Sequence, residues 1–216
     1  SVIENSIFED NGNTQRNGFV IQSRSKELLF TNNTINFTTL EKSACGLFVS
    51  VKSKLIVTKS TFTRCYTSSD DKASGLSYSG AQAGEELVIQ ENTFSDNGGY
   101  YCSSLLLRCV ELPLIKNLTL ANNNKNSKTN SWNLVVFFIQ RPHEFTFENI
   151  YFDNNNFNHS IEKNGGGIGL WVAEDNAQQT DRPSYELKFK DCTFRDNNAV
   201  NCGGGAFSYT SSSKTL

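Results

Sequence analysis

Apolar and polar residues alternate in a pattern that recurs along the whole chain. The pattern is apolar-x-apolar-x-polar-x-x-Phe-x-x-Asn, and four segments show it plainly: 2–11, 87–97, 145–155 and 187–197. Three further segments, centred on Ile35, Phe62 and Leu120, fit it with substitutions. Recurrence at intervals of 26 to 42 residues predicts a repeat architecture in which each unit is one structural module.

Each repeat carries one anchor residue, and the anchors divide the chain into seven units. The anchors are Phe8, Ile35, Phe62, Phe94, Leu120, Phe152 and Phe194. A second apolar stretch follows each anchor, at 18–21, 46–49, 75–78, 105–107, 134–137, 169–172 and 205–209. Each unit is therefore predicted to contain at least two short strands.

The first apolar stretch of each unit has a period of two residues. At Ile3, Phe30 and Val57 an apolar residue is followed by a polar one, and the same alternation holds in the other units. Such alternation is typical of a strand with one buried face and one solvent-exposed face. No segment shows the roughly ten residues of 3.6-residue periodicity that a helix needs.

The units lack the tight turns of β-hairpins, so each strand is expected to pair with its counterpart in the next unit. Such stacking places parallel strands about 4.8 Å apart and aligns equivalent side chains in columns. We predict an all-β fold, a right-handed parallel β-helix of about seven coils that forms a single domain over residues 1–216. Both ends fall inside a unit, so we expect a segment of a longer helix.

Asparagine recurs three residues after the anchor, where the chain must turn a corner. These residues are Asn11, Asn97, Asn123, Asn155 and Asn197. Asn tolerates the left-handed backbone that a sharp corner requires, and its amide can cap the turn above. We predict that they form a structural ladder. Two residues before the anchor, small or amide side chains such as Ser6, Asn33 and Ser60 are expected at an inward corner.

Composition narrows the classes of function. The formal net charge of −2 argues against an electrostatic nucleic-acid binder. The longest apolar run, 134–139, is far shorter than the roughly 20 residues of a membrane-spanning helix, so no direct membrane insertion is expected. The chain has only two His residues and its six cysteines form no CxxC pair, so we predict neither a zinc site nor another cofactor.

Cysteines and sequons become informative if the chain lies outside the cell. Six cysteines allow fifteen disulfide connectivities, among which we favour a Cys45–Cys65 pair, one coil apart. Sequons mark possible N-glycosylation sites at Asn32, Asn36, Asn117 and Asn158. Asn32 and Asn117 are expected at corners, and Asn36 and Asn158 in loops.

The acidic residues do not form a recognisable catalytic cluster. Asp70 and Asp71 lie in a polar stretch that is typical of a solvated loop. Asp10, Asp96 and Asp196 share one repeat position but belong to the first, fourth and seventh units, too far apart to meet. We therefore predict no catalytic residue.

Two features could serve recognition. Tyr100, Tyr101, Trp132 and Trp171 fall in or beside the second strands, where an aromatic platform could stack on sugar rings. Trp171 alternates with Leu170 and Val172, which favours core filling instead. The polar insert at 173–182 is the best candidate for a contact loop.

The last unit contains Phe194-Arg195-Asp196-Asn197 followed by Gly203-Gly204-Gly205-Ala206-Phe207. It resembles the chlamydial polymorphic outer-membrane-protein repeat, whose signatures are FxxN and GGA followed by an aliphatic residue. FxxN also begins at Phe8, Phe94 and Phe152, so the resemblance covers nearly the whole chain. The chain is also similar to the broader pectin-lyase-like family of right-handed β-helices.

The first resemblance implies surface display and adhesion. Our leading hypothesis is a non-catalytic structural or adhesion segment, secreted or at the cell surface, that forms part of a rod, stalk or filament. Its expected partners are adjoining β-helix coils of the parent chain and other surface proteins or glycans. The alternative, which the pectin-lyase-like resemblance implies, is a glycan-binding or polysaccharide-cleaving domain.

Overall fold

The computed structural model describes residues 1–13, 19–40, 45–50, 54–68, 73–80, 85–99, 102–109, 112–123, 132–138, 144–157, 166–173, 186–199 and 206–211. Within these residues every regular element is a β-strand, and every strand pair is parallel. The all-β fold class predicted from the sequence is thus confirmed.

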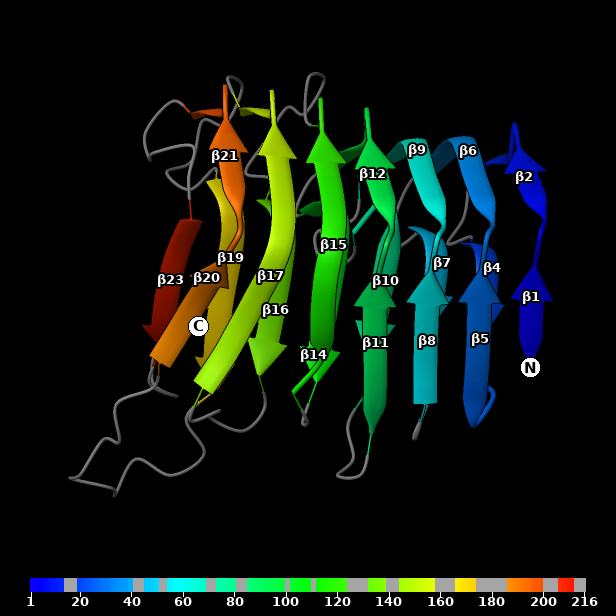
Figure 1. Ribbon diagram of the computed structural model, residues 1–216. Helices are drawn as coiled ribbons and strands as arrows, with labels where there is room; N and C mark the ends of the chain where they lie inside the picture. The colour runs from blue at the N-terminus through cyan, green and yellow to red at the C-terminus, as the bar shows by residue number, and fades with distance from the viewer. Residues whose placement is uncertain are drawn as a thin grey trace.

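The larger sheet contains two ladders of strands that meet at a corner (Figure 1). The first ladder runs through β1 (Val2–Glu4), β5 (Glu27–Thr31), β8 (Lys54–Thr58), β11 (Glu86–Gln90), β15 (Leu114–Ala121), β17 (Glu144–Asp153) and β20 (Glu186–Lys190). The second runs through β2 (Ile7–Glu9), β6 (Thr34–Leu40), β9 (Thr61–Thr67), β12 (Thr93–Ser95), the later halves of β15 and β17, and β21 (Thr193–Arg195). Short β3 (Gly12–Asn13) pairs with β6, and β13 (Gly98–Gly99) pairs with β9.

A second sheet lies behind the first and contains one described strand from each repeat unit. Its seven strands are β4 (Phe19–Ser23), β7 (Cys45–Val49), β10 (Leu76–Ser79), β14 (Cys102–Cys109), β16 (Trp132–Phe138), β19 (Gly166–Ala173) and β23 (Ala206–Ser211). A two-stranded ladder of β18 (Asn156–Phe157) and β22 (Asn198–Ala199) completes the described strands.

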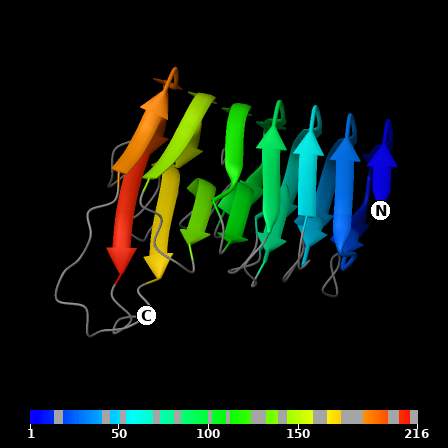
Figure 2. The ribbon, with the colours of Figure 1, turned by 60° about the horizontal axis from the view of Figure 1, so that its bottom comes forward.

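The chain winds with the same handedness along the whole solenoid. In Figure 1 the strands of the larger sheet point upward in front, those of the second sheet point downward behind, and successive windings advance from the N-terminus on the right towards the left. That path is right-handed, as predicted, and is the hand that parallel crossover connections favour. Figure 2 shows the same two layers, with the first and last windings at opposite ends.

The core consists of columns of equivalent side chains. Strand pairing places the seven anchors directly opposite one another in the order Phe8, Ile35, Phe62, Phe94, Leu120, Phe152, Phe194. Phe62 and Phe94 stack with their ring centroids 4.8 Å apart, close to the spacing between paired strands. A second column carries Phe147, whose ring lies 5.4 Å from that of Phe189. The windings are therefore held together by contacts between equivalent residues.

Candidate functional site

The predicted asparagine ladder is a chain of buried amides at the second corner. Asn97, Asn123 and Asn155 are at most 1% exposed. The Oδ1 atom of Asn123 accepts a hydrogen bond from the backbone N–H of Asn97 (2.9 Å), and its Nδ2 donates to the carbonyl of Phe94 (3.1 Å). In the same way, Asn155 accepts a hydrogen bond from the backbone N–H of Asn123 and donates one to the carbonyl of Leu120. Asn197 accepts from the backbone N–H of Asn155 and donates to the carbonyl of Phe152. These amides satisfy backbone groups of the preceding winding, which is a structural task.

The prediction that these asparagines adopt the left-handed backbone is wrong. The left-handed residue is the one before, with φ between 51° and 54° at Asp10, Arg64, Asp96 and Asp196 and similar values at Asn122 and Asn154. Because the chain already turns there, the side chain of the next residue points inward, where only a hydrogen-bonding group fits well. Lys, Arg and Glu occupy some left-handed corners at a cost of roughly 1–2 kcal/mol each.

The first corner uses the column two residues before the anchor. The Oδ1 atom of Asn33 accepts from the backbone N–H of Ser6 (2.9 Å), and Asn92 Oδ1 accepts from that of Ser60 (2.9 Å). The Nδ2 of Asn92 donates to the carbonyl of Val57 (2.8 Å). Leu118 and Ile150, both 1% exposed, take the same column in later windings. The corner therefore tolerates either a bonded amide or an aliphatic side chain.

The three predicted glycosylation sites within the described residues occupy two different settings. Asn32 is exposed and lies at a left-handed corner (φ 53°), and Asn117 lies at another (φ 54°), as expected. Asn36 lies within β6 and not in a loop, because its column continues the second ladder. Its Nδ2 donates to Glu9 Oε1 (2.9 Å) and its Oδ1 accepts from Arg64 Nη2 (2.7 Å). Asn158 lies outside the described residues, and glycosylation stays a prediction at all four sites.

The described cysteine side chains form no disulfide with one another. Cys65 is buried, and its Sγ lies 3.5 Å from the carbonyl of Thr63. The side chain of Cys45 lies outside the described residues, so the Cys45–Cys65 pair stays a prediction.

A buried polar cluster that includes a carboxyl group, a phenol and a thiol lies beside the second sheet. Tyr78 and Cys109 are almost fully buried, and Glu85 is 8% exposed. Burial, with the carboxylate of Glu85 nearby, raises the pKa of both Tyr78 and Cys109. The Cys109 thiol therefore stays protonated at neutral pH, which makes it a poor nucleophile.

Charged side chains gather on the outer face of the last two windings. Glu148 Oε1 lies 2.6 Å from Lys190 Nζ, and Asp153 receives two hydrogen bonds of 2.8 Å from Arg195. Hydrogen bonds from these cations hold the pKa of Glu148 and of Asp153 below their usual values. A general acid for glycosidic cleavage needs a raised pKa, so neither carboxyl group suits that role.

The outer face of the first five windings carries a column of aliphatic side chains, unlike the charged outer face of the last two windings. The sequence analysis did not predict this column. On the first ladder an aliphatic column runs through Val2, Leu29, Ile56, Val88 and Leu114. Val2 is 62% and Leu114 is 45% exposed, and the three between them are half-buried. The signal was present in runs of three apolar residues such as Leu28-Leu29-Phe30, because the middle residue of such a run in a strand must face outward.

A threonine column lies beside it on the second ladder. Thr34, Thr61, Thr93 and Thr119 pair in register and are all half-buried. Thr31 and Thr58, on the first ladder, hydrogen-bond through their hydroxyls at 2.8 Å. Together with the aliphatic column, these threonines give the outer face rows of hydroxyl and methyl groups.

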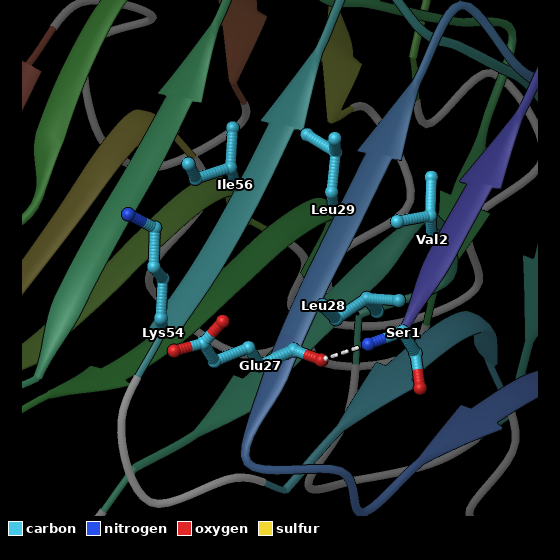
Figure 3. A pocket seen from close by; sticks show the side chains of 7 residues that line it. All are labelled: Ser1, Val2, Glu27, Leu28, Leu29, Lys54 and Ile56. Carbon is cyan, nitrogen blue, oxygen red and sulfur yellow. Dashed lines mark hydrogen bonds between the residues drawn. The ribbon is translucent and has the colours of Figure 1, made fainter.

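The start of the aliphatic column borders a pocket of about 270 Å³. It is lined by Ser1, Val2, Glu27, Leu28, Leu29, Lys54 and Ile56 (Figure 3). Lys54 pairs with Glu86 at 2.7 Å, and this hydrogen bond raises the pKa of the amine. A catalytic lysine needs the opposite shift, so Lys54 does not suit that role.

Other predicted features lie outside the described residues. They are Asp70, Asp71, Tyr100, Tyr101, most of the 173–182 insert, and the side chains of Trp132 and Trp171. In the part of the chain that the structure describes, no three His, Cys, Asp or Glu residues are placed to hold a metal ion. The described segments also contain no helix of the length and apolarity needed to span a membrane.

Comparison with known proteins adds no relative. No protein-family model, no curated protein and no solved structure matches the chain. The parallel β-solenoid fold is shown by the strand pairing itself.

Proposed function

We propose that the chain is a non-catalytic structural or adhesion segment of a secreted or cell-surface β-helix protein. The observation that carries this proposal is the ladder arrangement. Inward polar groups such as Asn97, Asn123 and Asn155 are committed to the neighbouring winding, and the outward columns present hydroxyl and methyl groups. Such a molecule offers an extended outer surface for contact and needs no pocket.

The resemblance to chlamydial polymorphic outer-membrane-protein repeats supports the surface location. The FxxN motifs that begin at Phe94, Phe152 and Phe194 now have a physical meaning, since the Phe enters the core column and the Asn enters the amide ladder. A repeat that encodes stacking alone suits a rod or stalk whose partners are adjoining coils, surface proteins or glycans. On this basis we propose an extracellular or cell-surface location.

The experiment compares cleavage with binding. The purified chain is incubated with polygalacturonate and other uronate polymers, and release of reducing ends is measured; the same preparation is applied to a glycan array. We expect no turnover. Turnover of any uronate polymer would overturn the proposal and favour the pectin-lyase-like alternative.

Contact by the outer face is tested with two double variants that both make the chain more positive. Beads coated with the chain are assayed for adhesion to cultured cells, and Ile56→Lys/Val88→Lys is expected to reduce adhesion. The control, Glu91→Lys/Asp96→Arg, adds cations at two corners of the fourth winding, which also carries Val88, and should leave adhesion unchanged. Equal adhesion by both variants would show that the aliphatic outer face does not make the adhesive contact.

One observation favours glycan binding as a second candidate. Trp171 pairs in register with Phe137 on one side and Tyr209 on the other, which places three aromatic residues in one column of the second sheet. An aromatic side chain on a solvent-exposed face can stack on a sugar ring. Binding on the glycan array that is lost in Trp171→Ala, without turnover, would favour this lectin-like function.

A further inference from the structure

A β-bulge interrupts the second sheet where β14 pairs with β16. Between two paired positions β14 contains both Ser103 and Ser104, whereas β16 contains Asn133 alone. All three residues are completely buried. Because a bulge disrupts the ladder of backbone hydrogen bonds, the polar side chains at this point need partners of their own.

Only one end of the Asn133 amide is bonded to the described part of the protein. Its Oδ1 accepts hydrogen bonds from the hydroxyls of Ser103 (2.9 Å) and Ser104 (3.4 Å). Its Nδ2 is shielded from solvent and has no hydrogen-bond partner among the described residues. Exchanging the two ends of the amide would let Nδ2 donate to both hydroxyls but would leave Oδ1 unpaired. Either orientation therefore leaves one buried polar atom without a partner.

The amide of Asn123, which is equally buried, shows the usual arrangement in this fold. Its Oδ1 accepts from the backbone N–H of Asn97, and its Nδ2 donates to the carbonyl of Phe94. Buried polar groups are nearly always bonded in this way, either to the protein or to ordered water. Asn133 differs from Asn123 in that its second end still needs a partner.

The column that contains Asn133 has space for a small partner on one side. Towards the preceding windings the column is closely packed, since a Cβ added at Gly75 would lie 2.6 Å from the carbonyl oxygen of Ser104. Towards the next winding, the pairing of β16 with β19 places Gly167 opposite Asn133, and glycine has no side chain. Because Oδ1 is turned to the serines of β14, the other end of the planar amide is turned away from them.

We infer that a buried water molecule binds Asn133 at this bulge and links its free amide end to the backbone of the next winding. Water suits the site because it both donates and accepts, so it can pair with the amide in either orientation. A buried water makes about three hydrogen bonds to such polar groups. An anion is disfavoured, because burying an unpaired charge is costly. The water performs at the second sheet the task that the amide ladder performs at the second corner.

A high-resolution crystal structure of the chain tests this inference. We expect an ordered water at about 2.7–3.2 Å from the end of the Asn133 amide that faces away from Ser103. The amide of Asn123, in the same electron-density map, is the control and should have no water at this distance. A protein atom bonded to the free end of Asn133, or no density there, would overturn the inference.

Asn133→Leu removes the amide and keeps a side chain of similar size. The water should be lost from the crystal structure of this variant. A water that persists at the same place would be held by other groups and would contradict binding by Asn133. The result from the unmodified chain stands whether or not this variant folds.

Nuclear Overhauser effects between water and side-chain amides give a second readout, in solution. The Nδ2 protons of Asn133 should show effects of opposite sign in the laboratory and rotating frames, which mark a long-lived bound water, and those of Asn123 should show none. Hydroxyl protons that exchange with solvent can relay such a signal, so the measurement is repeated on Ser103→Ala/Ser104→Ala, in which it should persist. Loss of the signal in this variant would assign it to the hydroxyls and contradict a bound water.

Discussion

Phe94 and Phe194 are equivalent residues with different surroundings. Both are anchors of their repeat, and each stacks on the anchor of a neighbouring winding, at 4.8 Å and 4.9 Å. Phe94 lies between two windings and is fully buried, whereas Phe194 lies in the last winding and is 36% exposed. The asparagines show the same contrast, since Asn123 bonds to two neighbouring windings while the Asn11 amide donates to the carbonyl of its own Glu9. The contribution of a repeat residue is therefore set by its neighbours along the axis as well as by its type.

The largest expected difference concerns the anchors. Phe94→Ala should lower the free energy of unfolding by about 3–5 kcal/mol, because it opens a cavity between two windings. Phe194→Ala should cost less than about 2 kcal/mol, since its ring is already partly in water. Urea denaturation followed by circular dichroism measures both. Equal costs would mean that burial by neighbouring windings does not set stability.

The amide ladder should give the next largest difference. Asn123→Ala leaves the N–H of Asn97 and the carbonyl of Phe94 without their partner, so it should cost about 2–4 kcal/mol. Asn11→Ala, in the first winding, should cost less than about 1 kcal/mol. The same urea titrations apply. A cost for Asn11→Ala as large as that for Asn123→Ala would contradict the ladder's dependence on its neighbours.

The left-handed corners allow a smaller, stabilising change. Glu91 has φ 58°, and its counterpart in the next winding is Asn117. Glu91→Asn should raise the free energy of unfolding by about 0.5–1 kcal/mol, because Asn adopts this conformation at lower cost. Gln90→Asn, one residue earlier within β11, is the control and should give no gain. A gain in both variants would show that the backbone conformation is not the cause.

The smallest expected effect is on the pH dependence of stability, and it comes from the ion pairs on the outer face of the last two windings. The pKa values of Glu148 and Asp153 are lowered in the folded chain by Lys190 and Arg195, so their stabilising effect is present above the unfolded-state pKa and is lost as the pH falls through the folded-state pKa. Between about pH 5 and about pH 3, Lys190→Ala/Arg195→Ala should therefore lose less stability than the unmodified chain. Urea midpoints across this range provide the measurement, and parallel pH profiles would show that the pairs have no effect.

Much of the fold was predictable because the repeat encodes it directly. The anchor spacing predicted which residues stack. The two-residue period predicted strands with one inward face, and the lack of hairpin turns predicted that these strands pair in parallel with the next unit. The inward amides were predicted to have a structural role, but their backbone conformation was assigned one residue too late. A sequence pattern shows which position recurs, but not which of two adjacent residues makes the turn.

The outer face was less predictable than the core. The aliphatic column through Leu29, Ile56 and Val88 was missed because a run of three apolar residues was counted only for its inward members. Asn36 was expected in a loop, yet it lies in β6, because the strand continues beyond its anchor. Pairing at the surface depends on residues 26 to 42 positions apart, which only the register of the folded windings brings together.

The central claim is that successive windings stack in register, and distances between spin labels test it directly. Thr34, Thr61 and Thr93 share one outward column with Thr193. Each is labelled in turn with Thr193, in a chain whose reactive cysteines are replaced, and the separation is measured by double electron–electron resonance. In-register stacking predicts backbone separations of about 24, 19 and 14 Å, a decrease of about 5 Å per winding. Separations that do not fall in these steps would contradict the solenoid and the function proposed from it.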